Sequence, residues 1–207
     1  RASPKTQSAL LEVMEESRVT VDGVPHEVGR PFLVIATQNP IEQAGTYKLP
    51  EAQLDRFMIK TSIGYPSLAV AERILAGDVD RNPSGKLSPV ITTKAVADMA
   101  DLAATVHVDP AVARYAAQLV EATRESDATK LGVSVRGAIS MMRIARVVAA
   151  SQGRHYVIPD DVKALAAPVW THRLVLDPEA EFSGTTSESV IERALTQVEA
   201  PLARASA

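Results

Sequence analysis

The chain of 207 residues has no cysteine, few aromatic residues and no excess of positive charge. Without cysteine there is no disulfide framework, no Cys-ligated zinc and no thiol nucleophile. Lys plus Arg number 22 against 25 Asp plus Glu, so the net charge of −3 gives no general attraction to nucleic acid or anionic lipid. No apolar run reaches the ~18 residues that a membrane span needs. A globular protein in the reducing cytoplasm is therefore expected.

The motifs of several enzyme classes are also absent. The four histidines lack the spacing of a metal site such as HExxH, and no GxSxG motif supports a Ser/His/Asp triad. Aromatic residues make up 4% of the chain, whereas small and aliphatic residues are abundant. This composition favours packing between helices over a β-sandwich.

The first 29 residues predict a helix and a β-hairpin. Residues 3–16 begin with Ser3 and Pro4, which suit the N-cap and the first helical position, and continue with apolar residues at helical spacing. Residues 18–29 alternate around Asp22-Gly23, a dipeptide typical of tight hairpin turns.

Two short apolar runs predict strands of a parallel sheet. Residues 32–36, Phe-Leu-Val-Ile-Ala, are strand formers without interruption, as expected where both faces of a strand are buried. Residues 57–63 predict a second strand, and residues 50–55 a short helix before it. This part of the chain therefore indicates an α/β fold.

Strand signals nearly disappear after Pro66, which suggests a boundary between a domain of residues 1–66 and an all-α domain of residues 67–207. Helices are predicted at 68–76, 93–106, 110–124, 135–150, 160–170 and 188–198, with loops at 77–91 and 177–186. The whole chain is thus predicted to be α/β but predominantly helical.

Asn39 is a candidate functional residue because of its place after the first predicted strand. Polar residues that follow a buried parallel strand lie at the sheet edge where ligands bind. The Asn39 amide could both donate to and accept from a water or a phosphate oxygen. Because Asn before Pro is also a common turn former, both interpretations stay open.

Arg56 is a second candidate. It precedes the second predicted strand, where its guanidinium could reach the phosphate of a neighbouring subunit. The alternative is an ion pair with Asp55 or another surface acid.

Arg136 is a third candidate, in the first turn of the predicted helix that follows the N-cap Ser134. The helix dipole disfavours a cation there unless an anion is also bound, and exposed amides plus an arginine bind phosphate well. Gly137 would let another backbone approach closely. The alternative is an exposed arginine without a function. The arginines at 143, 146, 154 and 173 make this part locally basic, which a solvated helix face explains as well as nucleic acid does.

Three segments together resemble the MoxR-type AAA+ ATPases, relatives of the magnesium chelatase ATPase subunit. The segments are PKTQSALLEVMEESRVTVDG, FLVIATQNPIEQAGTYKLPEAQLDRF and GVSVRG. The middle segment is very specific, because a strand, TQNP, a Gly-containing loop and LPEAQLDRF follow one another without a gap. The resemblance covers the whole chain and implies the C-terminal part of an AAA+ core, followed by the complete helical lid.

The resemblance also implies roles for the three candidates. Asn39 matches sensor 1, which positions the attacking water beside the γ-phosphate. Arg56 is similar to the arginine finger that enters the neighbouring subunit's site. Arg136 is similar to sensor 2, which reports the γ-phosphate to the lid. The hairpin at 18–29 matches one that faces the central pore or the substrate.

The chain departs from the family pattern in two motifs. It contains neither a GxxxxGK[ST] phosphate-binding loop nor an Asp-Glu pair that would hold Mg²⁺. Family members carry both upstream of the segments matched here. The resemblance therefore implies that this chain is a fragment, that ATP and Mg²⁺ are bound mainly by other segments, and that the chain alone is inactive.

For the full-length protein, the resemblance implies ATP hydrolysis in a homo-oligomeric ring, expected to be a hexamer. Hydrolysis would drive chaperone-like remodelling or maturation of protein clients, and von Willebrand factor A domain proteins are partners often found with the family. One alternative is a non-catalytic protein-interaction module. Another is a DNA-remodelling ring, against which the acidic charge balance argues.

Overall fold

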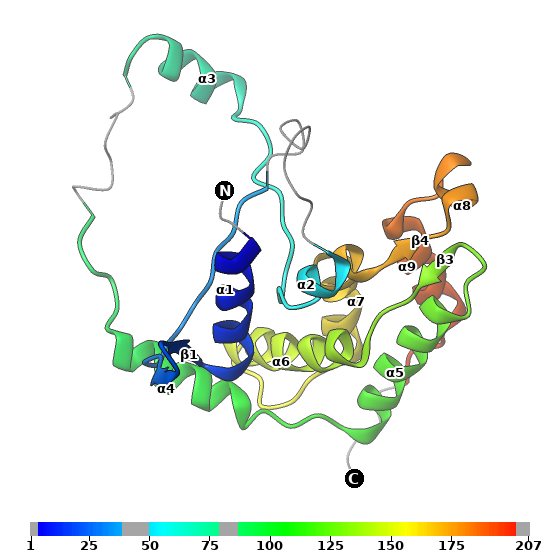
Figure 1. The fold of residues 1–207 in the computed structure, drawn as a ribbon. Coiled ribbons are helices and arrows are strands. Elements are labelled where there is room, and N and C mark those ends of the chain that lie inside the picture. Colours follow the sequence, from blue (N-terminus) through cyan, green and yellow to red (C-terminus); the bar gives the residue numbers. More distant parts are fainter. Residues whose placement is uncertain (1–3, 39–49, 79–86, 202–207) are drawn as a thin grey trace.

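The computed structural model describes residues 4–38, 50–78 and 87–201 (Figure 1). The predicted N-terminal helix and hairpin are both present, as α1 (Pro4–Glu16), β1 (Arg18–Val21) and β2 (Val24–Glu27). The strands pair antiparallel, with Val21 opposite Val24. Asp22 and Gly23 have φ angles of 51° and 79°, the left-handed values that a two-residue hairpin turn requires and that Asp-Gly adopts readily.

The two predicted parallel strands are not formed, and both predictions are wrong. Residues 32–36 and 57–63 carry no strand assignment, and the side chains of Leu33 and Ile35 are 78% and 83% exposed. A strand takes its backbone hydrogen bonds from its neighbours, and within the described ranges no other strand lies beside either run. The intervening short helix is confirmed as α2 (Glu51–Leu54).

The six helices predicted after Pro66 are all present, with ends within two residues of those expected. They are α3 (Leu68–Leu75), α4 (Thr93–Ala104), α5 (Pro110–Arg124), α6 (Val135–Ser151), α7 (Pro159–Trp170) and α9 (Ser187–Gln197). Local caps explain this accuracy. The Asp109 side chain accepts a hydrogen bond from Ala111 N–H at the start of α5, and the Ser134 side chain accepts one from Gly137 N–H at the start of α6.

The prediction that this part is all-α is wrong in detail. An antiparallel pair, β3 (Thr129–Leu131) and β4 (Val175–Leu176), joins segments more than forty residues apart. The predicted loop at 177–186 contains α8 (Pro178–Phe182), and a 3₁₀ turn, η3 (Thr171–Arg173), continues α7. Strands of two or three residues lack a detectable period, and the Asp177-Pro178 start of α8 suits a turn as well as a helix.

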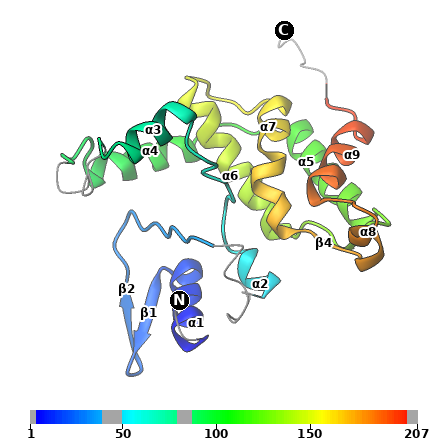
Figure 2. The ribbon, with the colours of Figure 1, turned by 90° about the horizontal axis from the view of Figure 1, so that it is seen from above.

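Helices α5, α6, α7 and α9, with η3, pack around one apolar core and are called the helical body below. Trp170, Tyr115 and Leu119 are fully buried there, and alanines such as Ala145 and Ala166 let the helices approach closely. Figure 2 shows α2 between α1 and this body. In Figure 1, α3 stands apart from the body, and none of its residues is buried. Among the described residues, no helix is both long and apolar enough to cross a bilayer.

Candidate functional site

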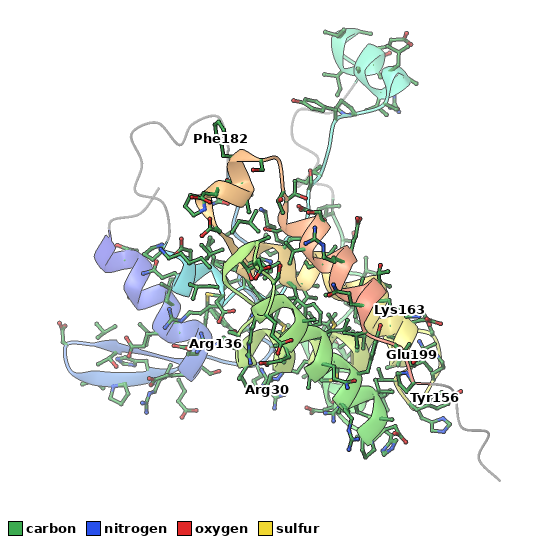
Figure 3. All side chains as sticks on the ribbon, turned by 90° about the vertical axis from the view of Figure 1, so that its right-hand side faces the viewer. Arg30, Arg136, Tyr156, Lys163, Phe182 and Glu199 are labelled. Carbon is green, nitrogen blue, oxygen red and sulfur yellow. The ribbon has the colours of Figure 1, made fainter. Side chains whose placement is uncertain are left out.

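The structure brings two of the three candidate residues to one point. Arg56 directly follows α2 and its C-cap, Arg136 lies in the first turn of α6, and both bind the carboxylate of Glu15 near the end of α1. Arg56 Nη2 is 2.8 Å from Glu15 Oε2, and Arg136 Nη2 donates to Glu15 Oε1. Arg136 lies on the side of the body that faces α1 (Figure 3). Asn39 lies outside the described residues, so its role stays a prediction.

The two arginines stabilise the ionised form of the Glu15 carboxylate. The hydrogen bond from Arg56 and the positive charge of Arg136 lower the pKa of Glu15, against the opposing effect of partial burial. Glu15 thus supplies an anion beside the first turn of α6, where a cation alone would be unfavourable. Each guanidinium group thus holds one oxygen of an anionic group, which is the kind of contact that it makes with a phosphate oxygen.

These ion pairs are open to solvent. The side chains of Arg136 and Glu15 are 44% and 34% exposed, and that of Arg56 is 25% exposed. Pairs so exposed are screened by water and contribute little to stability. A phosphate could therefore replace Glu15 on either arginine at little expense in free energy.

Asp55 has a different partner from its neighbour Arg56. Its carboxylate lies 2.8 Å from Nη1 of Arg173, whose side chain is fully buried. The interpretation of Arg173 as part of a solvated basic face is therefore wrong. The contact between Asp55 and Arg173 spans 118 residues and therefore has no local signal in the sequence.

The start of α6 is joined to the same carboxylate. Ser134 Oγ accepts a hydrogen bond from Gly137 N–H at 3.0 Å, which confirms its predicted capping role. The hydroxyl lies 3.0 Å from each Asp55 carboxylate oxygen, to which it donates. Asp55, the residue directly before Arg56, is therefore joined to the turn that carries Arg136.

Gly137 was predicted to let another backbone approach closely, and that prediction is wrong. The atoms that come close to Gly137 belong to side chains. A Cβ atom at this position would lie 2.7 Å from Val133 Cγ1 and 3.1 Å from Arg173 Cδ. The absence of a side chain at Gly137 thus leaves room for Arg173 to extend across the first turn of α6 toward Asp55.

His172 contacts the segment around Arg56, and its burial there predicts that the stability depends on pH. Its Nε2 lies 2.9 Å from the Phe57 carbonyl oxygen, so the neutral ring donates from Nε2. Burial, together with the charge of Arg173, lowers the pKa of His172 below its ordinary value of 6.5. The unfolded chain therefore binds the proton more readily than the folded one.

We expect the free energy of unfolding to fall as the pH drops from about 7.5 to about 5, because protonation near pH 6.5 favours the unfolded chain. In His172→Gln, whose amide N–H can still donate to the carbonyl, the free energy of unfolding should depend less on pH than in the wild type. The control is His26→Gln at an exposed position, which should keep the slope of the wild type. Urea titrations across this range measure the effect. Equal slopes in all three proteins would contradict it.

Arg56 and Arg136 fit a phosphate group. Arg56 and Arg136 supply guanidinium donors, which suit anionic oxygens. No group of three His, Asp or Glu side chains within residues 4–38, 50–78 and 87–201 is arranged to hold a cation.

Comparison with known proteins supports the resemblance. Residues 1–59 match the ATPase family associated with various cellular activities (AAA), and residues 121–194 match the AAA lid domain. YeaC of Bacillus subtilis, an uncharacterized protein, is 43% identical over 204 residues, which cover 99% of this chain and 64% of YeaC. Chaperone MoxR1 of Mycobacterium tuberculosis is 39% identical over 210 residues, which cover 97% of this chain and 55% of MoxR1.

A solved structure shows the same fold. The crystal structure of an inferred ATPase from Cytophaga hutchinsonii is similar with a TM-score of 0.88 at 34% identity, over 98% of this chain and 64% of that one. The present chain thus spans between 55% and 64% of the length of these proteins. The predicted fold class, part of an AAA+ core followed by a helical lid, is confirmed. The chain belongs to the MoxR-type family of AAA+ ATPases.

Proposed function

We propose that the full-length protein hydrolyses ATP in a homo-oligomeric ring, a hexamer, and uses this reaction to remodel or mature partner proteins. The observation that carries the proposal is that Arg56 and Arg136, the two arginines that match the family's motifs, each hold an anionic oxygen of Glu15. Two arginines so placed can bind phosphate oxygens and stabilise the charge that develops in phosphoryl transfer.

Each candidate residue has a distinct role in this proposal. Arg136 binds the γ-phosphate of the nucleotide in its own subunit and reports it to the helical lid. Arg56 extends to the nucleotide of the neighbouring subunit, and Asn39 orients the attacking water. The core part ends at residue 66 and the lid spans residues 67–207. The Mg²⁺ ligands and the phosphate-binding loop come from segments outside these 207 residues.

The proposal extends to partners and place. Protein clients and von Willebrand factor A domain proteins are the expected partners in a cytoplasmic complex. The similarity to Chaperone MoxR1 supports protein clients, and the acidic charge balance disfavours nucleic acid.

The chain of 207 residues on its own is expected to show no ATP hydrolysis above background, because its sequence has no phosphate-binding loop and no Asp-Glu pair. The full-length protein should hydrolyse ATP, and a variant without its phosphate-binding lysine should not. Phosphate release measured on the three proteins tests this. Full-length protein no faster than the lysine variant would contradict the proposed function.

A further inference from the structure

The guanidinium group of Arg173 holds the segment around Arg56 from both sides. Its Nη1 donates to Asp55 Oδ1 at 2.8 Å, and its Nη2 donates to the Phe57 carbonyl oxygen at 2.7 Å. Its Nε donates to the Val169 carbonyl oxygen at 2.9 Å, which fixes the group to α7. Asp55 and Phe57 flank Arg56 directly, so the backbone that presents Arg56 is fastened to the helical body.

The same network reaches the turn that carries Arg136. Asp55 accepts from the Ser134 hydroxyl, and Ser134 caps α6 two residues before Arg136. Gly137, the next residue, leaves the space through which Arg173 passes. The two candidate arginines are thus linked through a short chain of direct contacts that uses Asp55, Ser134 and Arg173.

The connection through Arg173 is much stiffer than the one through Glu15. Arg173 is fully buried, and its planar group donates in fixed directions to three backbone or carboxylate oxygens. Removal of one partner would leave a buried charge uncompensated, which is strongly unfavourable. The exposed pairs of Glu15 exchange easily with other anions. Nucleotide can therefore displace Glu15 while the Arg173 network stays intact.

We infer that Arg173 and Asp55 are positioning residues that hold Arg56 in a fixed place relative to Arg136, so that the helical body and Arg56 move together. This inference rests on the proposed function, in which Arg136 binds the nucleotide of its own subunit and Arg56 acts on that of the neighbour. A movement of the body on nucleotide binding then changes where Arg56 is presented. The state of one site is transmitted to the next through Arg173 and Asp55.

The mechanical part can be tested on the 207-residue chain, which has no cysteine of its own. Spin labels at Glu51→Cys on α2 and Val147→Cys on α6, two exposed positions, report the distance between the Arg56 segment and the body. We expect a single narrow distance distribution that broadens in Arg173→Met. Arg143→Met, at an exposed arginine of α6, is the matched control and should leave the distribution narrow. A narrow distribution in Arg173→Met would overturn the inference.

The functional part uses rings of the full-length protein. Wild-type subunits are mixed with an excess of subunits that lack the phosphate-binding lysine, so that the deficient neighbours contribute Arg56 without hydrolysing ATP themselves. When the deficient subunits also carry Arg173→Met, we expect the rate of hydrolysis per wild-type subunit in assembled rings to fall at least tenfold. When they carry Arg143→Met instead, this rate should not change. A purely structural role would reduce ring assembly and leave the rate per assembled ring unchanged.

The outcomes separate the inference from the function on which it rests. Equal rates with and without Arg173→Met in the deficient subunits overturn the inference alone. Failure of the unmodified deficient subunits to support hydrolysis overturns the proposed function, and the inference with it. If Arg173→Met subunits do not assemble, Asp55→Asn decides, because Asn keeps the volume and an acceptor for Ser134 but loses the charge that faces Arg173. An unchanged rate in Asp55→Asn also overturns the inference.

Discussion

Arg56→Ala in the full-length protein is expected to lower the rate of ATP hydrolysis by about 10³-fold or more, while nucleotide binding stays largely intact. Glu15 is one group that Arg56 must leave in order to act. It pairs with Glu15, whose side chain is 34% exposed, whereas that of Arg56 is 25% exposed. The pair is open to solvent on the side of Glu15 and is screened by water, whereas a loss of 10³-fold in rate is about 4 kcal/mol of transition-state stabilisation. The pair with Glu15 is therefore not by itself a strong hold on Arg56.

A matched variant distinguishes the two roles of Arg56. If Arg56 served only to neutralise Glu15, then Glu15→Gln would make Arg56 dispensable, and Arg56→Ala would have little effect in that background. For an arginine that acts on phosphate, Arg56→Ala remains as damaging with Gln at position 15 as with Glu. Steady-state phosphate release and nucleotide affinity, measured on the single and double variants, decide between these cases.

Complementation between subunits provides the second control for Arg56. Arg56→Ala subunits mixed with subunits that lack the phosphate-binding lysine should regain part of the activity, because each supplies what the other lacks. Complete inactivity of such mixtures in well-formed rings would show that Arg56 does not act between subunits.

Elements with local signals were predicted well from the sequence. The hairpin turn depends on Asp22-Gly23 alone, and α5 and α6 begin at the caps Asp109 and Ser134, so the residues that decide each element lie within a few positions of it. The predicted strand at 32–36 failed for the opposite reason. An apolar run forms a buried strand only when other strands pair with it, and none of the strands among the described residues pairs with residues 32–36.

The candidate site divides in the same way. Arg56 and Arg136 could be singled out from their positions beside a predicted strand and in the first turn of a helix. Glu15 and Arg173 could not, because the Glu15–Arg136 pair spans 121 residues and the Asp55–Arg173 pair spans 118. A charged residue gives no sign in the sequence of which distant partner it will meet. The acids and bases that organise this site therefore became visible only in the structure.

Trp170→Ala is expected to lower the free energy of unfolding by about 4 kcal/mol, the largest stability effect that we predict. Trp170 is fully buried where α7 packs on α6, and its Nε1–H donates to the Gly137 carbonyl oxygen at 3.1 Å. The substitution leaves a cavity behind the turn that carries Arg136 and removes this hydrogen bond. Urea denaturation followed by circular dichroism measures the loss.

Two further variants separate the causes of this loss. Trp170→Phe keeps most of the ring volume and should cost about 1 to 2 kcal/mol, through the lost hydrogen bond and a smaller cavity. Phe182→Ala, at an aromatic residue that is 95% exposed (Figure 3), should change the stability by less than about 0.5 kcal/mol. Similar effects of Trp170→Ala and Phe182→Ala would contradict the burial of Trp170 between α6 and α7. They would also contradict the conclusion that Trp170 supports the turn around Arg136.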